Sequence, residues 1–176
     1  MKTRVAINGF GRIGRMAFRI MSERSDIEVV GINDLTDTKT LAHLLKHDTN
    51  YGQFNHKVDH DEVSIIVDDV HIPVSCIKDA TTLPWGNLRV DVVIESTGRF
   101  VTTEAASAHL QAGAKKVVLS APAKDAGITK TLVIGANEDE LSEAGDVISN
   151  ASCTTNSIAA VMDIMEREFG VDKAML

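Results

Sequence analysis

A glycine-rich turn near the N-terminus constrains the fold of this chain more than any other segment. The apolar residues 4–8 predict a short strand, which is followed by Gly9-Phe10-Gly11-Arg12-Ile13-Gly14 and by a helical pattern through residues 16–21. A second predicted strand, over residues 27–33, ends at Asp34. This order is typical of a βαβ unit with Gly-x-Gly-x-x-Gly between the first strand and its helix.

Each glycine of the motif has its own physical role. Gly9 permits a tight turn, Gly11 lets backbone amides approach a pyrophosphate, and Gly14 lets the helix pack closely on the strand. The start of the helix then supplies a positive field for the phosphates. The motif by itself is weak evidence, but here a strand precedes it and a helix follows it. We therefore predict a dinucleotide site at this turn.

The acidic residue at the end of the second strand predicts which dinucleotide binds. Asp34 can accept hydrogen bonds from the hydroxyls of an adenine ribose. Its carboxylate would repel a 2′-phosphate at the same place. The expected cofactor is therefore NAD in preference to NADP.

The rest of the chain continues an α/β pattern. Val63–Val67 and Val70–Ile77 flank Asp68-Asp69, which predicts an antiparallel hairpin at the edge of the sheet. Residues 51–61 are polar and predict a loop. Further strands are expected over 90–95, 116–119, 131–136 and 146–149, and helices over 36–46, 103–113 and 137–143. The predicted fold is a mostly parallel, doubly wound Rossmann-type sheet with an edge hairpin.

Small residues follow two of these strands. Ser96-Thr97-Gly98 comes after the strand over 90–95, and Ser120-Ala121-Pro122 comes after the strand over 116–119. The carboxyl ends of parallel strands are where ligands bind in an open α/β sheet. Both segments are therefore expected to lie beside the cofactor.

Composition excludes several other classes of function. The net charge of −7 argues against a nucleic-acid surface, and no apolar run approaches the roughly 18 residues that span a bilayer. The histidine pairs His43/His47 and His56/His60 lack further ligands at a suggestive spacing, so no metal site is expected. Two cysteines without a disulfide pattern point to a reducing cytoplasm.

A second segment, Ser149 to Asn156, predicts a turn that delivers Cys153 to the start of a helix. Ser152 is a candidate N-cap, apolar residues recur at helical spacing from Ile158 to Phe169, and Gly170 is a plausible stop. A sulfur on the first turn lies at the positive end of the helix dipole, which favours the thiolate. Cys153 is thus a candidate nucleophile, although a packed thiol at a helix start is the alternative.

These motifs together are similar to those of the phosphorylating glyceraldehyde-3-phosphate dehydrogenases. Ala6 to Arg15 resembles the opening of that family, the segments at Glu95 and Ser120 resemble its later cofactor-side segments, and Ser149 to Asn156 resembles its active-site signature. The resemblance covers essentially the whole chain. Lys78 replaces the arginine of many members, and Ser157 and Ala160 replace the commonest residues after the signature.

The resemblance implies roles for individual residues. Cys153 would be the nucleophile, and Ser152 and Thr154 would help to bind phosphate. The candidate cofactor residues are Gly9, Gly11, Arg12, Ile13, Gly14, Asn33, Asp34, Lys78, Ser96, Thr97, Gly98 and Ser120. The implied reaction is NAD-dependent oxidative phosphorylation of D-glyceraldehyde 3-phosphate to 1,3-bisphosphoglycerate, in glycolysis, through a thioester on Cys153.

The resemblance also implies a longer protein. Members are about twice as long, and no histidine follows Cys153 in this chain to act as the catalytic base. We expect residues 1–150 to form an NAD-binding domain and residues 151–176 to begin a catalytic domain whose remainder is absent. The chain alone is expected to be inactive, and the full-length protein to be a cytoplasmic homotetramer.

Two alternatives stay open at this point. Erythrose-4-phosphate dehydrogenase shares the cysteine signature and the cofactor motif, and the residues that separate the two substrates lie mostly beyond residue 176. A non-catalytic NAD-binding module is the second alternative. The absent histidine favours it, and the intact Ser152-Cys153-Thr154 argues against it.

Overall fold

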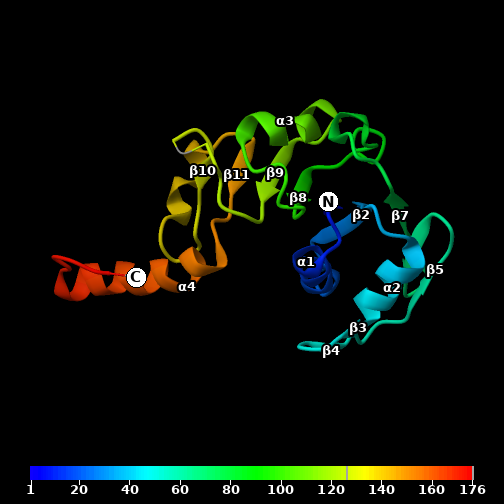
Figure 1. Cartoon of the computed structure of the whole chain (residues 1–176), viewed down its shortest axis with the longest axis horizontal. Coiled ribbons are helices and arrows are strands. Elements are labelled where there is room, and N and C mark those ends of the chain that lie inside the picture. Colours follow the sequence, from blue (N-terminus) through cyan, green and yellow to red (C-terminus); the bar gives the residue numbers. More distant parts are fainter. Residues whose placement is uncertain (126, 176) are drawn as a thin grey trace.

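The central strand of the molecule is β1 (Thr3–Asn8), which carries the glycine-rich turn at its carboxyl end (Figure 1). It pairs in parallel with β2 (Ile27–Asn33) on one side and with β8 (Val92–Glu95) on the other. This computed structural model describes residues 1–125 and 127–175. The predicted βαβ unit is confirmed, since α1 (Arg12–Ser22) connects β1 to β2.

The parallel sheet extends on both sides of this unit. Beyond β8 lie β9 (Lys116–Leu119), β11 (Val147–Ser149) and the two-residue β10 (Lys130–Thr131). Beyond β2 lies β7 (Val70–Ser75), which is also parallel to β2. With β6 (Ser64–Val67) and β5 (Val58–His60) next to β7, the full order is β10-β11-β9-β8-β1-β2-β7-β6-β5. The predicted fold class, a mostly parallel α/β sheet, is therefore confirmed.

The predicted edge hairpin is also present. β6 (Ser64–Val67) pairs with β7 in antiparallel fashion, and the connecting residues Asp68 and Asp69 have φ of 48° and 66°. Positive φ at both positions is the backbone of a type I′ hairpin turn, which matches the twist of the two strands. Aspartate tolerates this left-handed region better than most residues.

The secondary structure predicted for two segments was wrong. Residues 51–61 contain β4 (Gly52–Gln53), which pairs with β3 (His47–Asp48), and β5 (Val58–His60), which pairs with β6. These short polar strands are held by pairing with their neighbours, which no local pattern reveals. The strand expected over residues 131–136 stops at Thr131. The chain then turns, because the side chain of Asn137 accepts a hydrogen bond from the amide of Val133.

Helices cover both faces of the sheet, so the predicted double winding is confirmed. On one face α1 and α2 (Thr38–Lys46) enclose a core that includes Ile7, Phe18 and Leu45. On the other face α3 (Thr103–Gln111) and the segment around the 3₁₀ turn η1 (Ala80–Thr82) enclose a core around Trp85. A second 3₁₀ segment, η2 (Glu138–Glu143), lies where a short acidic helix was expected.

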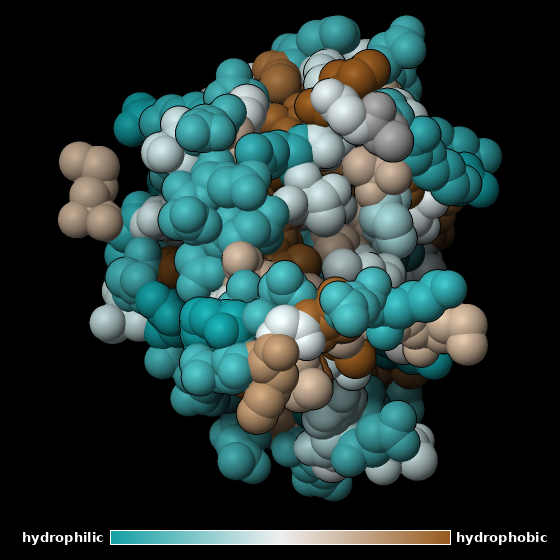
Figure 2. All heavy atoms as spheres, turned by 90° about the vertical axis from the view of Figure 1, so that its left-hand side faces the viewer, coloured by the Kyte–Doolittle hydropathy of each residue, from teal (hydrophilic) through white to brown (hydrophobic). Residues whose placement is uncertain are grey.

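The last helix, α4 (Cys153–Phe169), projects away from the sheet (Figure 1). None of its residues is buried, and 77% of Phe169 is exposed. Figure 2 looks onto the side from which α4 projects and shows hydrophobic residues interspersed among polar ones. Within residues 1–125 and 127–175, no helix combines the length and the apolarity that crossing a membrane requires.

We predict that Gly14→Ala disrupts the contact between α1 and the turn. A Cβ at position 14 would lie 2.1 Å from the carbonyl oxygen of Gly9, so the backbone would have to move. We expect a loss of about 3 kcal/mol in the free energy of unfolding, measured by urea denaturation. Gly11→Ala is the control, because a Cβ there meets no atom within 4 Å and the stability should change by less than about 1 kcal/mol. Equal stabilities for the two variants would contradict the packing argument.

A second prediction concerns pH. The ring of His56 lies between Asp68, 2.5 Å from Nδ1, and Glu23, 3.0 Å from Nε2, and these hydrogen bonds raise the pKa of His56 above its ordinary 6.5. A raised folded-state pKa stabilises the fold below about pH 6.5, and the contribution disappears as the pH rises through that raised value. The free energy of unfolding should therefore fall as the pH rises above about 6.5.

The test is urea denaturation of the wild type and two variants at pH 6 and at a series of higher pH values. His56→Gln should lower the stability at pH 6 and flatten the pH dependence, because glutamine carries no charge. His60→Gln changes an exposed histidine on the nearby strand β5 and should keep the wild-type slope. An unchanged slope in His56→Gln would show that this cluster does not control the pH dependence.

Candidate cofactor site

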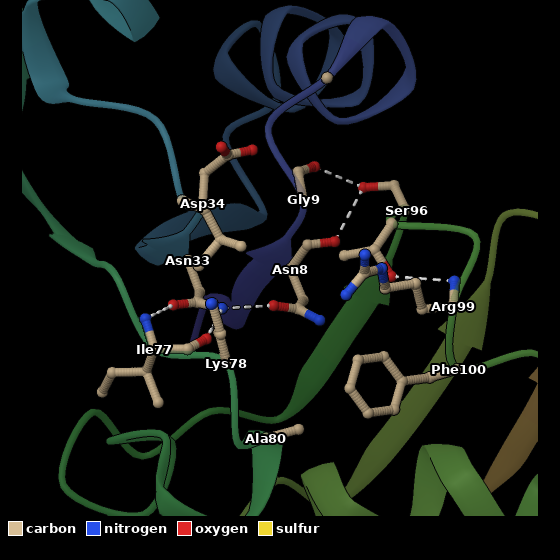
Figure 3. Close-up of a pocket in the computed structure, with 13 residues that line it drawn as sticks. Asn8, Gly9, Asn33, Asp34, Ile77, Lys78, Ala80, Ser96, Arg99 and Phe100 are labelled. Atoms are coloured by element: carbon tan, nitrogen blue, oxygen red, sulfur yellow. Dashed lines mark hydrogen bonds between the residues drawn. The ribbon is translucent and has the colours of Figure 1, made fainter.

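A cavity of about 360 Å³ opens at the carboxyl ends of β1, β2 and β8 (Figure 3). The connections from β1 and β8 lead to helices on opposite faces of the sheet, which is the switch point where open α/β sheets bind ligands. The residues that line the cavity are Asn8, Gly9, Gly11, Asn33, Asp34, Leu35, Ile77, Lys78, Ala80, Ser96, Thr97, Arg99 and Phe100.

The glycine-rich turn leaves the start of α1 open toward this cavity. Gly9 has φ of 90°, which a glycine adopts without strain, and Gly11 is the N-cap residue with no side chain to occupy the first amides. Arg12 and Ile13 are the first two residues of the helix. The first amides of an uncapped helix are a ready site for an anionic group such as a phosphate.

Asp34 lines the cavity and also holds the turn. Its Oδ2 accepts a hydrogen bond of 2.7 Å from the amide of Phe10, and its Oδ1 accepts one from the amide of Thr36. The same peptide segment is held from the other side, where Arg15 donates to the carbonyl oxygen of Phe10 at 3.0 Å. The sequence predicted Asp34 as a ligand for ribose, and its contact with the turn was not predicted.

The guanidinium of Arg15 lies partly buried under this turn. Burial lowers the pKa of Arg15 from its ordinary value, and the nearby carboxylate of Asp48 acts in the opposite direction. Its Nε is buried without a hydrogen-bond partner among the described residues. Arg15 stays charged in any case, so it adds positive potential beneath the open start of α1.

The loop after β8 closes the other side of the cavity. The hydroxyl of Ser96 lies 2.7 Å from the carbonyl oxygen of Gly9 and 3.1 Å from that of Asn8, so it ties this loop to the turn. Thr97 accepts a hydrogen bond from the amide of Arg99. The structure therefore adds lining residues that the sequence did not predict, namely Asn8, Leu35, Ile77, Ala80, Arg99 and Phe100. Only proximity in the fold identifies them.

The structure brings some predicted cofactor residues together at the cavity and leaves others outside its lining. The predicted residues that line it are Gly9, Gly11, Asn33, Asp34, Lys78, Ser96 and Thr97. The predicted residues outside it are Arg12, Ile13, Gly14, Gly98 and Ser120. Gly14 is packed under the turn, and Ser120 follows β9, where its amide donates to the carbonyl oxygen of Glu95. The roles of all these residues in binding stay predictions.

The cysteine segment has the local structure that its sequence predicts. Cys153 is exposed and is the first residue of α4, and the hydroxyl of Ser152 caps the helix by accepting a hydrogen bond from the amide of Thr155. Gly170 ends the helix with φ of 71°. The residue before the cap was not predicted to be unusual, yet Ala151 has φ of 60° and is buried. A left-handed residue other than glycine is strained, and such strain is common beside functional residues.

The cysteine segment lies at the same edge of the sheet as the cavity. It follows β11, which is three strand positions from β1 and therefore roughly 14 Å away at the usual spacing of strands. Ser152, Cys153 and Thr154 do not line the cavity formed by the described residues. That the sulfur and the cavity serve the same bound cofactor stays a prediction.

Comparisons with known proteins identify a family of NAD-binding domains that has the sequence of this site. Residues 3–103 match a family model described as "Glyceraldehyde 3-phosphate dehydrogenase, NAD binding domain". The chain is 57% identical to glyceraldehyde-3-phosphate dehydrogenase of Thermotoga maritima over 98% of its length, 49% identical to that of Mycoplasma pneumoniae over 96%, and 48% identical to that of Geobacillus stearothermophilus over 100%.

The chain spans about half the length of these curated relatives, between 50% and 52% of each. The segment that the family model covers runs from β1 to the start of α3 and includes every residue that lines the cavity. Because this segment is more than half of the chain, the chain belongs to the family of NAD-binding domains of glyceraldehyde 3-phosphate dehydrogenase.

Proposed function

We propose that this chain is the NAD-binding part of an enzyme that converts D-glyceraldehyde 3-phosphate and inorganic phosphate to 1,3-bisphosphoglycerate. One observation carries the proposal. In a chain of this family, the glycine turn, Asp34 and the Ser96-Thr97 loop surround one cavity at the switch point of the sheet. In this proposal residues 1–150 are the NAD-binding domain, and residues 151–176 begin a catalytic domain.

The residues around the cavity suit the parts of a dinucleotide. The amides of Gly11, Arg12 and Ile13 would bind the pyrophosphate at the start of α1, and Asp34 would accept hydrogen bonds from the adenine ribose. Lys78, which lines the cavity, would lie on the adenine side. The remaining ribose and the nicotinamide would be bordered by Asn33, Ser96, Thr97, Gly98 and Ser120. When bound, NAD supplies the hydride acceptor for the oxidation.

Cys153 would supply the covalent chemistry. Its thiolate attacks the aldehyde carbon, and the carbonyl oxygen takes up a proton to give a hemithioacetal. A base outside residues 1–176 would then take the proton of the hemithioacetal hydroxyl as hydride leaves the same carbon, which gives a thioester. The resulting thioester on Cys153 is then attacked by inorganic phosphate, which releases the acyl phosphate and restores the thiolate. The amide of Cys153 would stabilise the oxyanion, and the hydroxyls of Ser152 and Thr154 would bind the attacking phosphate.

The full-length protein is proposed to be a cytoplasmic homotetramer, as the resemblance of the sequence to its family implies. The substrates are small molecules, a sugar-phosphate aldehyde and inorganic phosphate. Neither a nucleic acid nor a membrane has a part in this proposal.

The proposal predicts that this chain binds NAD but does not catalyse oxidation of the aldehyde. Isothermal titration of residues 1–176 with NAD should give a saturable binding isotherm. With aldehyde and phosphate added, NADH formation should be at least about 10²-fold below that of the full-length protein, because the general base is missing. Absence of NAD binding would refute the assignment of the cavity, and substantial NADH formation would refute the division of the activity between two domains.

Asp34 should control the choice between NAD and NADP. Asp34→Asn keeps the shape of the side chain and removes its charge, so repulsion of a 2′-phosphate is lost. The ratio of Kd for NADP to Kd for NAD should fall by about tenfold or more. Affinity for both cofactors should also decline, because Asp34 holds the amide of Phe10. An unchanged ratio would exclude Asp34 from the choice.

Cys153 should be essential in the full-length protein. Cys153→Ser should lower phosphorylating dehydrogenase activity at least about a thousandfold, since loss of a nucleophile removes the covalent route. Cys76→Ser is the matched control, because Cys76 is exposed and has no role in the proposal. Activity should be measured as NADH formation with aldehyde and phosphate. Equal activities for the two variants would rule out Cys153 as the nucleophile.

A further inference from the structure

A buried carboxylate lies beneath the cofactor cavity and has no role in the chemistry described above. Glu95 is the last residue of β8 and is 2% exposed. Its Oε1 accepts hydrogen bonds from both the amide and the hydroxyl of Thr97. Its Oε2 accepts from Nδ2 of Asn8 at 2.6 Å and lies 2.9 Å from Nε2 of His109. Within the described residues, these partners include no lysine or arginine.

The hydrogen on His109 can be placed from its other partner. The indole nitrogen of Trp85 lies 3.1 Å from Nδ1 of His109, and an indole N–H can only donate. Nδ1 must therefore accept, so the hydrogen of the neutral ring lies on Nε2 and points at Glu95. Both Trp85 and His109 are completely buried, which makes an unpaired group costly at either position.

The orientations of the side-chain amides of Asn33 and Asn8 follow in the same way, starting from the backbone amide of Ile77. The amide of Ile77 can only donate, and it lies 2.9 Å from Oδ1 of Asn33 (Figure 3). Nδ2 of Asn33 then donates to Oδ1 of Asn8 at 2.7 Å, which leaves Nδ2 of Asn8 to donate to Glu95. Each amide is therefore held in one of its two possible orientations.

Two chains of hydrogen bonds, from Trp85 and from Ile77, thus run toward Glu95 and end there. A carboxylate has about four acceptor positions, and the four donors around Glu95 fill them. The donors belong to Asn8, Thr97 and His109, and the chain through Asn8 continues to Asn33 and Ile77. Among these residues Asn8, Asn33, Ile77 and Thr97 all line the cavity. One acidic side chain therefore fixes the positions of groups from strands β1 and β2, from the loops at Ile77 and Thr97, and from helix α3.

We propose that Glu95 is a positioning residue for the cofactor, which acts by orienting Asn8 and the Thr97 loop and does not itself touch the ligand. His109 and Trp85 set the direction of the hydrogen bonds on its buried side. The proposal rests on the proposed function of the cavity as the NAD site. The proposal depends on the directions of the hydrogen bonds around Glu95. A substitution can reverse these directions without changing the volume of the side chain at position 95.

The first test replaces Glu95 by its isosteric amide in the 176-residue chain. Donors face both oxygens of Glu95, so the NH₂ group of Glu95→Gln meets either Asn8 and His109 or Thr97, and at least one donor loses its acceptor. The Kd for NAD, measured by isothermal titration, should rise about tenfold. Glu104→Gln removes the same charge at an exposed position of α3, and its Kd should stay within about twofold of the wild type.

The second test is a double-mutant cycle with Asn8→Asp. Alone, this variant sets a second carboxylate against Glu95, and the two repel each other. Combined with Glu95→Gln, the carboxylate introduced at position 8 can accept from both Asn33 and the amide introduced at position 95, although His109 still faces an NH₂ group. The double variant should therefore bind NAD more tightly than either single variant. A role in filling space alone predicts no such recovery.

A third measurement needs no ligand and separates this proposal from the proposed function. Glu95→Gln gives the amide of Thr97 a neutral acceptor in place of a charged one, or an NH₂ group if the new amide turns over. Hydrogen exchange at Thr97 should therefore be about tenfold faster relative to the amide of Val93, which lies within β8. If the wild type fails to bind NAD, the proposed function fails, and the exchange at Thr97 still decides whether Glu95 holds the loop.

Three outcomes would overturn the proposal. The first is a Glu95→Gln variant that matches Glu104→Gln in both NAD affinity and exchange at Thr97. The second is a double variant that binds NAD more weakly than both single variants. If a single variant does not fold, a folded double variant with a protected Thr97 amide supports the proposal, and an unfolded double variant is the third outcome that overturns it.

Discussion

A close approach between two backbone segments underlies the whole arrangement. The α-carbon of Gly14 packs so near the carbonyl of Gly9 that a single added methyl group would collide with it at 2.1 Å. This contact sets α1 against the end of β1 and directs the open amides of the helix toward the carboxyl edge of the sheet. Because the helix carries no N-terminal side-chain cap, those amides remain able to bind a phosphate.

Polar side chains at this edge have a second function, which is to make the edge rigid. Strands that are buried on both faces are apolar along their length, and here Asn8, Asn33 and Glu95 come at the ends of β1, β2 and β8. A buried polar group is expensive unless it is paired, so these three residues stabilise the fold only when their hydrogen bonds are complete. Trp85 and Ile77 complete them from the two ends of the network.

The sequence predicted the elements whose information is local. The glycine spacing predicted the first βαβ unit, the two aspartates predicted the hairpin turn, and the N-cap at Ser152 predicted the start of the cysteine helix. β5 was missed, since a polar strand of three residues forms only where β6 offers it partners.

By itself, the sequence determined the class of fold, the turn at Gly9 to Gly14 and the candidate nucleophile, because each depends on residues close together in the chain. Only the tertiary structure decided which residues share the cavity, that Asp34 holds the turn as well as lining the site, and that Glu95 and His109 meet beneath it. The hydrogen bonds that join Phe10 to Asp34 and His109 to Glu95 connect residues 24 and 14 positions apart in the chain. The directions of the hydrogen bonds that lead to Glu95 are fixed by two buried groups that can only donate, the amide of Ile77 and the indole N–H of Trp85.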